Sequence, residues 1–385
     1  MTETATATPA PDALASVVAD ASFVRLVATD DGDALAAAGL LARALRTVGT
    51  PFQVRVARDP VPDDEADAVT VTLGASTGEH AVPGTERPAS TTAFAVAREL
   101  GDDPDPVLAL AGVVAAGSVP GTDGSGDALA AAERTERVRR RPGVAIPTAD
   151  LADGLSASTL IRAPYSGDPE AARAALAALD LPMELDDDDH RRLASLVAVD
   201  VAAAESASER AAASVERALR PYATDDTAAA FETVGGYADV LDALAREQPG
   251  TGVALALTDE PSEPVRTAAL DVWRTHGLAV HRALDVATTG RYDGCVVARV
   301  DAPESTLPTI ARLVRDFRSP EPVAIAVDEA AGAIAAAATE SVGLGAACRD
   351  VAVEFDGDGW GSAARGGVSV DGGTTDALAA LRGAL

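Results

Sequence analysis

The sequence predicts an α/β protein with two lobes: a parallel, doubly wound N-terminal domain and a smaller α/β C-terminal domain, joined by a long helical connector. Three observations support this prediction. Apolar strand patterns alternate with helical patterns over residues 20–117, residues 150–222 are helical throughout, and α/β alternation resumes at residue 224. Strands that alternate with helices are typical of a parallel sheet. The 385 residues also suffice for two domains with separate cores.

The first predicted domain covers residues 20–130 and follows a leader, residues 1–19. The leader begins with MTETATATPAP, which is polar and lacks the basic and apolar regions of a signal peptide, so we expect it to be disordered. A glycine-rich break at 117–127 ends the α/β pattern. Before it, apolar runs predict strands at 23–28, 52–57 and 68–73, and helical periodicity predicts helices at 34–48, 91–100 and 106–116.

The connector region, residues 131–223, is predicted to carry one long helix. Apolar residues recur at helical intervals from residue 190 to residue 219, with arginines and glutamates between them, and Pro221 ends the pattern. We expect this helix to lie between the two lobes. The acidic run at 186–189 is expected to be solvated at its N-terminal end, where negative charge is favourable.

The C-terminal domain is predicted to cover residues 224–385. The glycine-rich segment 357–367 has two readings: a tight turn between strands, or a loop that binds nucleic acid with a base stacked on Trp360 beside Arg365. Apolar runs predict strands at 252–258, 279–285, 294–300, 323–328 and 351–355, and helices are predicted at 264–276, 305–315 and 375–381.

The charge composition excludes several kinds of chemistry. The chain has 60 acidic and 31 basic residues, a formal net charge of −29, and every basic residue is an arginine. Without lysine there can be no P-loop lysine, Schiff-base lysine or lysine general base. The acidity, the abundance of alanine and valine and the aromatic content of 3% are typical of a salt-adapted cytoplasmic protein, as in halophilic archaea. Such acidity disfavours nucleic acid in dilute buffer but does not exclude it in concentrated salt.

Two further absences narrow the class of protein. No stretch approaches the ~18 uninterrupted apolar residues that a membrane span needs, so no membrane partner is expected. Cys295 and Cys348 are far apart and flanked by small apolar residues, which predicts buried thiols rather than a disulfide or a zinc site.

An acidic loop is the first candidate site. Asp30, Asp31 and Asp33 directly follow the strand predicted at 23–28 and precede the helix predicted at 34–48. They therefore lie at the carboxyl end of a strand, where open α/β sheets bind ligands. Two carboxylates in one cleft can hold a divalent metal through hard oxygen ligands. The alternative is that Asp30 caps the helix and the other two are solvated. The residues alone favour neither reading.

A second candidate is the arginine run that contains Arg137, Arg139, Arg140 and Arg141, the most basic segment of this acidic chain. It could follow a phosphate backbone. It could equally be a solvated helix end, because cations are favourable near a helix C-terminus.

Several short segments, in this order, resemble the DHH phosphoesterase superfamily and its archaeal RecJ-like members. Asp31-Gly32-Asp33-Ala34 stands where the family has Asp-x-Asp-Gly, and the helix that follows matches in its Ala-Ala-Ala-Gly-Leu-Leu run. GVAIPTADLADGLSAS at 143–158, APYSGD at 163–168 and GGYADVL at 235–241 follow in the expected order. The resemblance implies a two-lobed DHH fold whose second lobe is a DHH-associated domain that grips single-stranded nucleic acid in active relatives.

The resemblance also implies a two-metal site, with manganese or magnesium, that is mostly lost in this chain. Asp31 and Asp33 match the family, and Glu79 and His80 are the nearest placement of the Asp-His-His triplet. Val-Thr-Leu-Gly at 71–74 and Ala-Ala-Gly at 115–117 replace segments with further aspartates, and Gly359-Trp360 replaces part of a Gly-Gly-His phosphate clamp. We therefore interpret Asp31, Asp33 and His80 as vestigial metal ligands, and a protein that holds no cofactor fits this reading.

Three functions follow from these observations. The first is a non-catalytic or weakly active, scaffold-like factor of DNA replication or repair, since members of this fold serve as scaffolds beside GINS and MCM proteins. The second is an active manganese-dependent exonuclease on single-stranded DNA or RNA, or a small phosphoesterase, which requires that Asp31, Asp33 and His80 converge with another carboxylate. The third is a nucleic-acid binder, which requires Arg137, Arg139, Arg140, Arg141 and Arg365 on one face.

Overall fold

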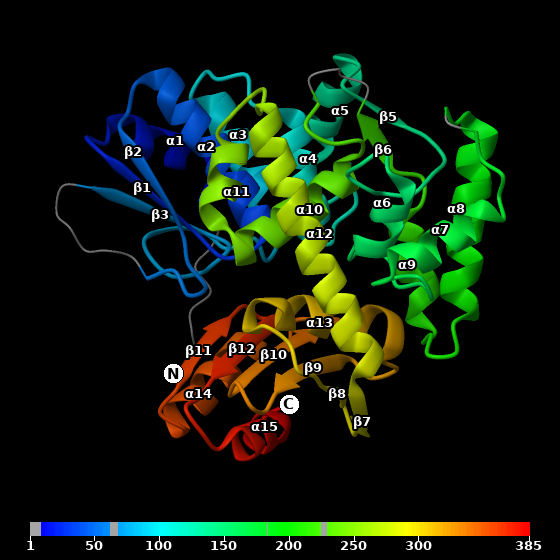
Figure 1. Ribbon diagram of the computed structural model, residues 1–385. Coiled ribbons are helices and arrows are strands. Elements are labelled where there is room, and N and C mark those ends of the chain that lie inside the picture. The colour runs from blue at the N-terminus through cyan, green and yellow to red at the C-terminus, as the bar shows by residue number, and fades with distance from the viewer. Residues whose placement is uncertain (1–8, 62–67, 183, 225–228) are drawn as a thin grey trace. The chain divides into compact units, whose positions relative to one another are not determined.

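The computed structural model describes residues 9–61, 68–182, 184–224 and 229–385 (Figure 1). They form two compact units, each built from two segments of the chain. Unit 1 contains residues up to Arg140 together with Tyr222–Trp273, and unit 2 contains Arg141–Pro221 together with Arg274–Leu385. The contiguous ranges predicted from the sequence do not coincide with these units, because the chain returns to unit 1 after residue 221.

Unit 1 is built on a parallel sheet of four strands in the order β2-β1-β3-β4, which confirms the predicted parallel α/β architecture. β1 (Val24–Ala28), β2 (Phe52–Val56) and β3 (Val69–Leu73) lie within a residue of the predicted ranges. β4 (His80–Val82) was not predicted. The register aligns Ala28 of β1 with Val56 and Leu73, so these strands end at one edge of the sheet.

The central helix of unit 1 is α2 (Gly32–Val48), whose residues from Gly32 to Leu45 are all buried. It packs against the helices α3 (Ala89–Glu99), α4 (Pro106–Ala115), α10 (Val234–Glu247) and α11 (Pro249–Ala256). A Cβ atom at Gly39 would lie 2.7 Å from the carbonyl oxygen of Ala256, so α2 and α11 touch through their backbones. These contacts explain why residues 234–256 belong to unit 1 rather than to a separate C-terminal domain.

The predicted leader contains a helix. α1 (Pro11–Asp20) begins with a proline, which suits the first turn, and buries Leu14, Ala15 and Val18 in contact with α3. The expectation of disorder is wrong for these residues, and residues 1–8 lie outside the described part of the chain. Unit 1 is completed by α5 (Gly126–Arg134), the antiparallel pair β5 (Val138–Arg140) and β6 (Tyr222–Thr224), and the first part of α12 (Glu263–Val286).

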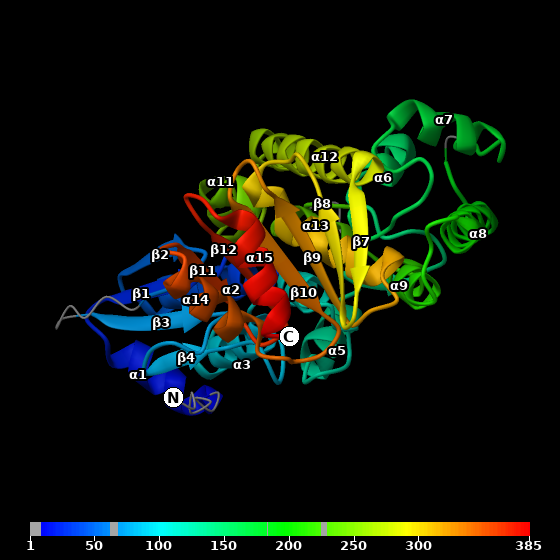
Figure 2. The same cartoon turned by 90° about the horizontal axis from the view of Figure 1, so that it is seen from below.

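Unit 2 is built on a six-stranded sheet in the order β11-β12-β10-β9-β8-β7, in which only the pair β8–β9 is parallel. Alternate strand residues face two separate apolar cores, one containing Ala324 and Ala326, the other Ile325 and Val327. Helices therefore cover both faces of this sheet, as Figure 2 shows for α13 and α15. The strands are β7 (Thr288–Tyr292), β8 (Cys295–Arg299), β9 (Val323–Asp328), β10 (Ala333–Ala338), β11 (Asp358–Gly361) and β12 (Arg365–Ser369).

The long connector helix predicted at 190–219 is wrong. Two helices, α8 (Asp187–Ala203) and α9 (Arg210–Ala218), occupy that range, and both pack into a core of unit 2 through Val197, Val201 and Val215. The longest helix is instead α12, with 24 residues, which contributes to both units. The other helices of unit 2 are α6 (Leu151–Ala157), α7 (Pro169–Ala177), α13 (Leu307–Leu313) with the one-turn segments η1 (Glu304–Thr306) and η2 (Val314–Arg318), α14 (Leu344–Glu354) and α15 (Thr374–Gly383).

Three predicted strands are helical. Residues 252–258 lie largely in α11, residues 279–285 lie within α12, and residues 351–355 form the end of α14. All three segments are short and apolar, a pattern that a buried strand and a buried helix share. Among the described residues, no helix is both long enough and apolar enough to cross a bilayer.

Candidate functional site

Asp31 is the N-cap of the central helix α2. Its Oδ1 accepts a hydrogen bond of 2.9 Å from the backbone N–H of Ala34, and its Oδ2 accepts one from the hydroxyl of Thr29. Only 4% of the residue is exposed. The predicted helix cap is therefore present, but Asp31 provides it rather than Asp30, whose carboxylate lies 3.6 Å from the guanidinium of Arg58. Capping uses the carboxylate to satisfy backbone donors that the helix leaves without partners.

Asp33 caps a different helix. Its Oδ2 accepts a hydrogen bond of 2.7 Å from the N–H of Ala89, and its Oδ1 accepts one of 2.9 Å from the N–H of Ser90, both at the start of α3. The N-cap residue of α3 is Pro88, whose side chain makes no capping bond, so Asp33 supplies that function from α2. Burial, and secondly the charge of Asp31, raise the pKa of Asp33 to about 7.

A third carboxylate lies at the same place, and the sequence did not indicate it. Asp242 of α10 accepts a hydrogen bond of 2.7 Å from the N–H of Gly32, the first residue of α2, and forms an ion pair of 3.2 Å with Arg246. Asp242 follows the GGYADVL segment, but nothing local marks it as a partner of a helix 210 residues away. Among the residues that the structure describes, no group of three or more histidine, cysteine, aspartate or glutamate side chains is arranged to hold a metal ion.

Two small residues, Gly74 and Ala115, pack closely against residues next to Asp31 and Asp33. Gly74, which directly follows β3, has φ +82°, and a Cβ atom there would overlap the hydroxyl of Thr29. Ala115, at the end of α4, lies so close to Gly32 that a Cβ atom at position 32 would be 2.8 Å from its own. Gly74 thus lies against Thr29 and Ala34, and Ala115 against Gly32, in the two segments where the resemblance described above leads us to expect aspartates.

The strand register does not bring His80 together with Asp31 and Asp33. It is the first residue of β4 and pairs with Val71, two residues before β3 ends, whereas Asp31 and Asp33 follow the end of β1. Glu79 precedes the strand and is exposed. The three predicted metal ligands are therefore two aspartates with capping roles and one histidine on a strand.

The arginine run is divided between the two units. Arg137 is a structural residue of unit 1, because its guanidinium lies 2.8 Å from Oδ1 of Asp105, the N-cap of α4. Arg139 and Arg140 are exposed on β5, and the Arg140 guanidinium lies 5.5 Å from the centroid of the Tyr222 ring. Arg141 is the first residue of unit 2. Only Arg139 and Arg140 thus present exposed cations on one strand.

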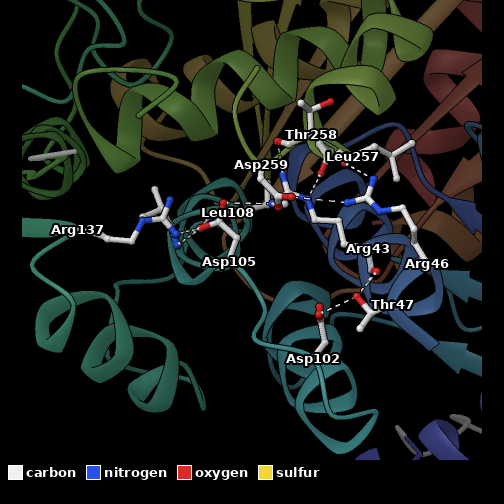
Figure 3. Close-up of polar contacts among 12 residues, drawn as sticks. Arg43, Arg46, Thr47, Asp102, Asp105, Leu108, Arg137, Leu257, Thr258 and Asp259 are labelled. Atoms are coloured by element: carbon white, nitrogen blue, oxygen red, sulfur yellow. Dashed lines mark hydrogen bonds and ion pairs between the residues drawn. The ribbon is translucent and has the colours of Figure 1, made fainter. Parts of the chain in front are cut away.

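Asp105 belongs to a network that sequence reasoning missed (Figure 3). Its second oxygen lies 3.4 Å from the guanidinium of Arg43, a residue of α2 that is 5% exposed. Arg43 also donates to the carbonyl oxygens of Ala256 and Thr258 and pairs with Asp259 at 2.8 Å. These bonds connect α2, α4 and the end of α11, and each donor in them has an acceptor.

Trp360 and Arg365 lie on neighbouring strands of unit 2. Trp360, on β11, is only 9% exposed, and its indole lies over Gly367 of β12, where a Cβ atom would overlap the ring. The segment 357–367 is thus largely a hairpin of two strands, and the tryptophan packs inside it. Arg365, also on β12, pairs with Ala337 in the register of the sheet.

Two solved structures are similar to this arrangement of elements. A crystal structure of CDC45 from Entamoeba histolytica matches 97% of this chain and 98% of its own chain, with a TM-score of 0.64 and 9% sequence identity. RecJ from Thermus thermophilus, in complex with Mg²⁺, matches 98% of this chain with a TM-score of 0.50 and 13% identity. This chain spans about half of that RecJ, 52%.

Sequence comparison gives a nearer relative. The uncharacterized protein rrnAC1427 of Haloarcula marismortui is 48% identical over 385 residues, which cover 98% of each chain. Residues 287–383, the β7–α15 part of unit 2, match the family model described as the C-terminal domain of the uncharacterized protein rrnAC1427. The chain thus has the RecJ-like DHH fold, and it belongs to the family of rrnAC1427.

Proposed function

We propose that this chain is a non-catalytic, cytoplasmic DHH-fold protein that acts as a scaffold in DNA replication or repair. One observation carries the proposal: both remaining family aspartates cap helices. The carboxylate of Asp31 accepts hydrogen bonds from Thr29 and Ala34, and that of Asp33 accepts two from the start of α3. These carboxylates stabilise the fold of unit 1, so the chain has a reason to keep them without any reaction.

The residues present do not fit a two-metal site. Each metal of such a site needs several ligands, and a pair of metals is bridged and surrounded by carboxylates and imidazoles. The T. thermophilus RecJ of known structure is a complex with Mg²⁺ or Mn²⁺. Here the described residues offer two capping aspartates and no group of three or more possible ligands. We therefore derive no catalytic step through a metal.

Single-stranded nucleic acid and replication proteins of the GINS and MCM kind are the partners that this proposal names. Arg139 and Arg140 support the first, because they are exposed cations on one strand of a chain with net charge −29. Exposed arginines can contact phosphates, and these two would do so from opposite faces of β5, because successive strand residues point to opposite faces. The similarity in fold to CDC45 over nearly the whole chain supports replication proteins as the partners to test.

One observation favours the alternative, a manganese-dependent exonuclease or small phosphoesterase. Asp31 and Asp33 are like charges in a buried place, and the resulting pKa of Asp33, about 7, shows that its charge is poorly stabilised. A bound cation would stabilise both carboxylates, as is common where acids are gathered at a metal site.

The deciding experiment measures release of nucleotides from labelled single-stranded DNA and RNA, in multimolar potassium chloride with manganese. The wild type is compared with a variant carrying Asp31→Asn and Asp33→Asn, because asparagine still caps helices but binds divalent cations poorly. We expect no release from either protein, while an active RecJ from a salt-adapted organism cuts under the same conditions. Manganese-dependent release by the wild type that disappears in the variant would overturn the proposal.

The scaffold role is tested separately with purified GINS and MCM proteins from a halophilic archaeon. We expect co-elution with one of them in size-exclusion chromatography at high salt. If the folded chain binds neither of these proteins nor labelled single-stranded DNA, the partner assignment is wrong even where the nuclease assay is negative.

A further inference from the structure

A small pocket in unit 2 has an unusual lining for so acidic a protein. It lies beside α8, α9 and the end of η2, and its volume is about 60 Å³; Figure 2 labels α8 and α9. Its polar lining comes from Arg162, Arg318 and Ser206, and the rest is apolar, including Val201, Ala207 and Phe317. All of these residues belong to unit 2.

The two arginines share a single carboxylate. Arg162 is only 9% exposed, and its guanidinium donates to the carboxylate of Asp285 and to the carbonyl oxygen of Ser166. Arg318 donates to the carbonyl oxygen of Leu284 at 2.8 Å, near the end of α12. Its Nε is buried and has no hydrogen-bond partner among the described residues. Two positively charged guanidiniums thus lie near a single carboxylate, that of Asp285, although the chain has 60 acidic residues.

A structural role explains only part of this arrangement. A cation at the C-terminal end of a helix is favourable, so the bond from Arg318 to Leu284 has a reason of its own. This bond uses one of the five N–H donors of the Arg318 guanidinium, and the Nε donor still has no acceptor. Burial, and secondly the charge of Arg162, lower the pKa of Arg318, as expected for two cations held close together. The neighbouring His281 is fully buried with its pKa lowered to about 3, so it stays neutral and adds no charge.

The size of the pocket limits what can bind. A cavity needs about 10–15 Å³ of such volume for one water molecule, so 60 Å³ holds roughly four or five. That is the size of one tetrahedral oxyanion, which has five heavy atoms. Guanidiniums present planar sets of donors that match the oxygens of phosphate, and a charge-assisted bond of this kind is about twice as strong as a neutral one.

We propose that the pocket lined by Arg162 and Arg318 binds one phosphate group. The phosphate accepts from both guanidiniums, supplies the acceptor that Nε of Arg318 lacks, and balances the excess positive charge beside Asp285. Its source is either free inorganic phosphate or the phosphate of a small nucleotide whose remaining atoms extend out of the pocket. This inference does not depend on the proposed scaffold role, since the pocket lies wholly within unit 2.

The test is equilibrium dialysis of the full chain against radiolabelled inorganic phosphate, with adenosine monophosphate as competitor. Multimolar potassium glutamate replaces potassium chloride, because chloride is itself a competing anion. We expect saturable binding of about one phosphate per chain. Arg318→Gln, which keeps the length of the side chain, should weaken it about tenfold or more. Ala207→Leu, which fills the pocket and keeps its charge, should do the same.

Arg315→Gln is the matched control, since Arg315 lies in the same segment, pairs with Asp316 at 2.7 Å and does not line the pocket. It should bind phosphate as the wild type does. Displacement by the nucleotide at concentrations well below those of inorganic phosphate identifies a nucleotide as the source, and the reverse order identifies free phosphate. The proposal is overturned by a wild type that binds neither, or by binding that Arg318→Gln and Ala207→Leu both leave unchanged.

Discussion

The two aspartates at the start of α2 and the two arginines of the unit 2 pocket are both pairs of like charges with limited exposure, yet they differ in what surrounds them. Four donors, three of them backbone N–H groups, meet the oxygens of Asp31 and Asp33. Arg318 lines a pocket, and its buried Nε has no hydrogen-bond partner among the described residues. A buried charge is structural where the fold supplies its partners, and it points to a ligand where the fold does not.

The largest effect on stability is expected from placing an acidic side chain at Gly74. Gly74→Asp adds an acid next to the strand after which the resemblance leads us to expect one, but its Cβ must overlap Thr29 from a backbone with φ +82°. Strain, overpacking and a third buried acid together should lower the free energy of unfolding by about 5 kcal/mol or more. Denaturant titration of purified protein, or its absence from the soluble fraction, measures this loss.

Gly49→Asp is the control for that substitution. Gly49 has nearly the same backbone angle, φ +80°, and no atom lies within 4 Å of a Cβ atom placed there. It should cost only about 1 kcal/mol. If the two variants are equally stable, the tight packing of Gly74 against Thr29 does not exclude a side chain at position 74. Manganese binding by a folded Gly74→Asp protein would show that one added carboxylate restores the metal site.

The next largest effect concerns pH. The pKa of Asp33 is about 7 in the folded protein and 3.8 as its ordinary value, so the folded state keeps a proton that the unfolded chain releases. This contribution to stability is complete below about pH 4 and is lost as the pH rises to about 7, a change on the order of 4 kcal/mol. In Asp33→Asn the residue does not titrate. The free energy of unfolding of the wild type relative to this variant should therefore fall between pH 4 and 7 and stay constant above pH 8.

Chemical denaturation at constant high salt measures this difference. Asp30→Asn removes an acid from the same loop and leaves Asp33 in place, so it should keep the pH dependence of the wild type. A difference between wild type and Asp33→Asn that does not change with pH would mean that Asp33 is ionised throughout, like an ordinary helix cap.

A smaller effect is expected at the cap of α2. Asp31→Ala removes the acceptor for the N–H of Ala34 and should lower the free energy of unfolding by about 1–2 kcal/mol. Asp31→Asn keeps an acceptor oxygen and should cost less than half of that. Equal losses in the two variants would show that the charge of Asp31, rather than its capping bond, stabilises unit 1.

Local patterns were sufficient for part of the fold. The three strands that begin unit 1 and the strand β9 have strong apolar patterns bounded by polar residues, and they were predicted within a residue or two. The alanine-rich segments were not predicted correctly. No strand was predicted at β10 (AIAAAA), and a strand was predicted at residues 279–285, which lie in α12. Alanine fits either element, so packing partners decide, and these lie elsewhere in the chain.

The candidate site shows the same limit. The position of Asp31 and Asp33 after the first strand could be predicted, but not their roles, because the amides that Asp33 caps lie 56 and 57 residues away and Asp242 lies 210 residues from Gly32. Sequence patterns also did not predict the ion pair of Arg137 with Asp105 or that of Arg162 with Asp285. The arginine run, for which a shared face is predicted, spans the boundary between the two units.

The smallest effect distinguishes Arg137, which pairs with Asp105, from the two exposed arginines of β5. Arg139→Gln with Arg140→Gln should leave the free energy of unfolding within about 0.5 kcal/mol of the wild type, because both side chains are exposed. Affinity for single-stranded DNA should fall a few-fold. If both arginines contact phosphates, the slope of log K against log salt should become shallower by roughly 1.4, about 0.7 for each lost contact. Fluorescence anisotropy over a series of salt concentrations measures both quantities.

Arg137→Gln should give the opposite result. It breaks the ion pair with Asp105, whose side chain is 12% exposed, and should cost about 1–2 kcal/mol of stability while the salt slope stays that of the wild type. Arg139→Gln alone removes the same single charge from the same segment, so a comparison of these two single variants excludes net charge as the explanation. If all three arginines change the slope alike, Arg137 also reaches the nucleic acid, and the division between structural and available charges fails at this strand.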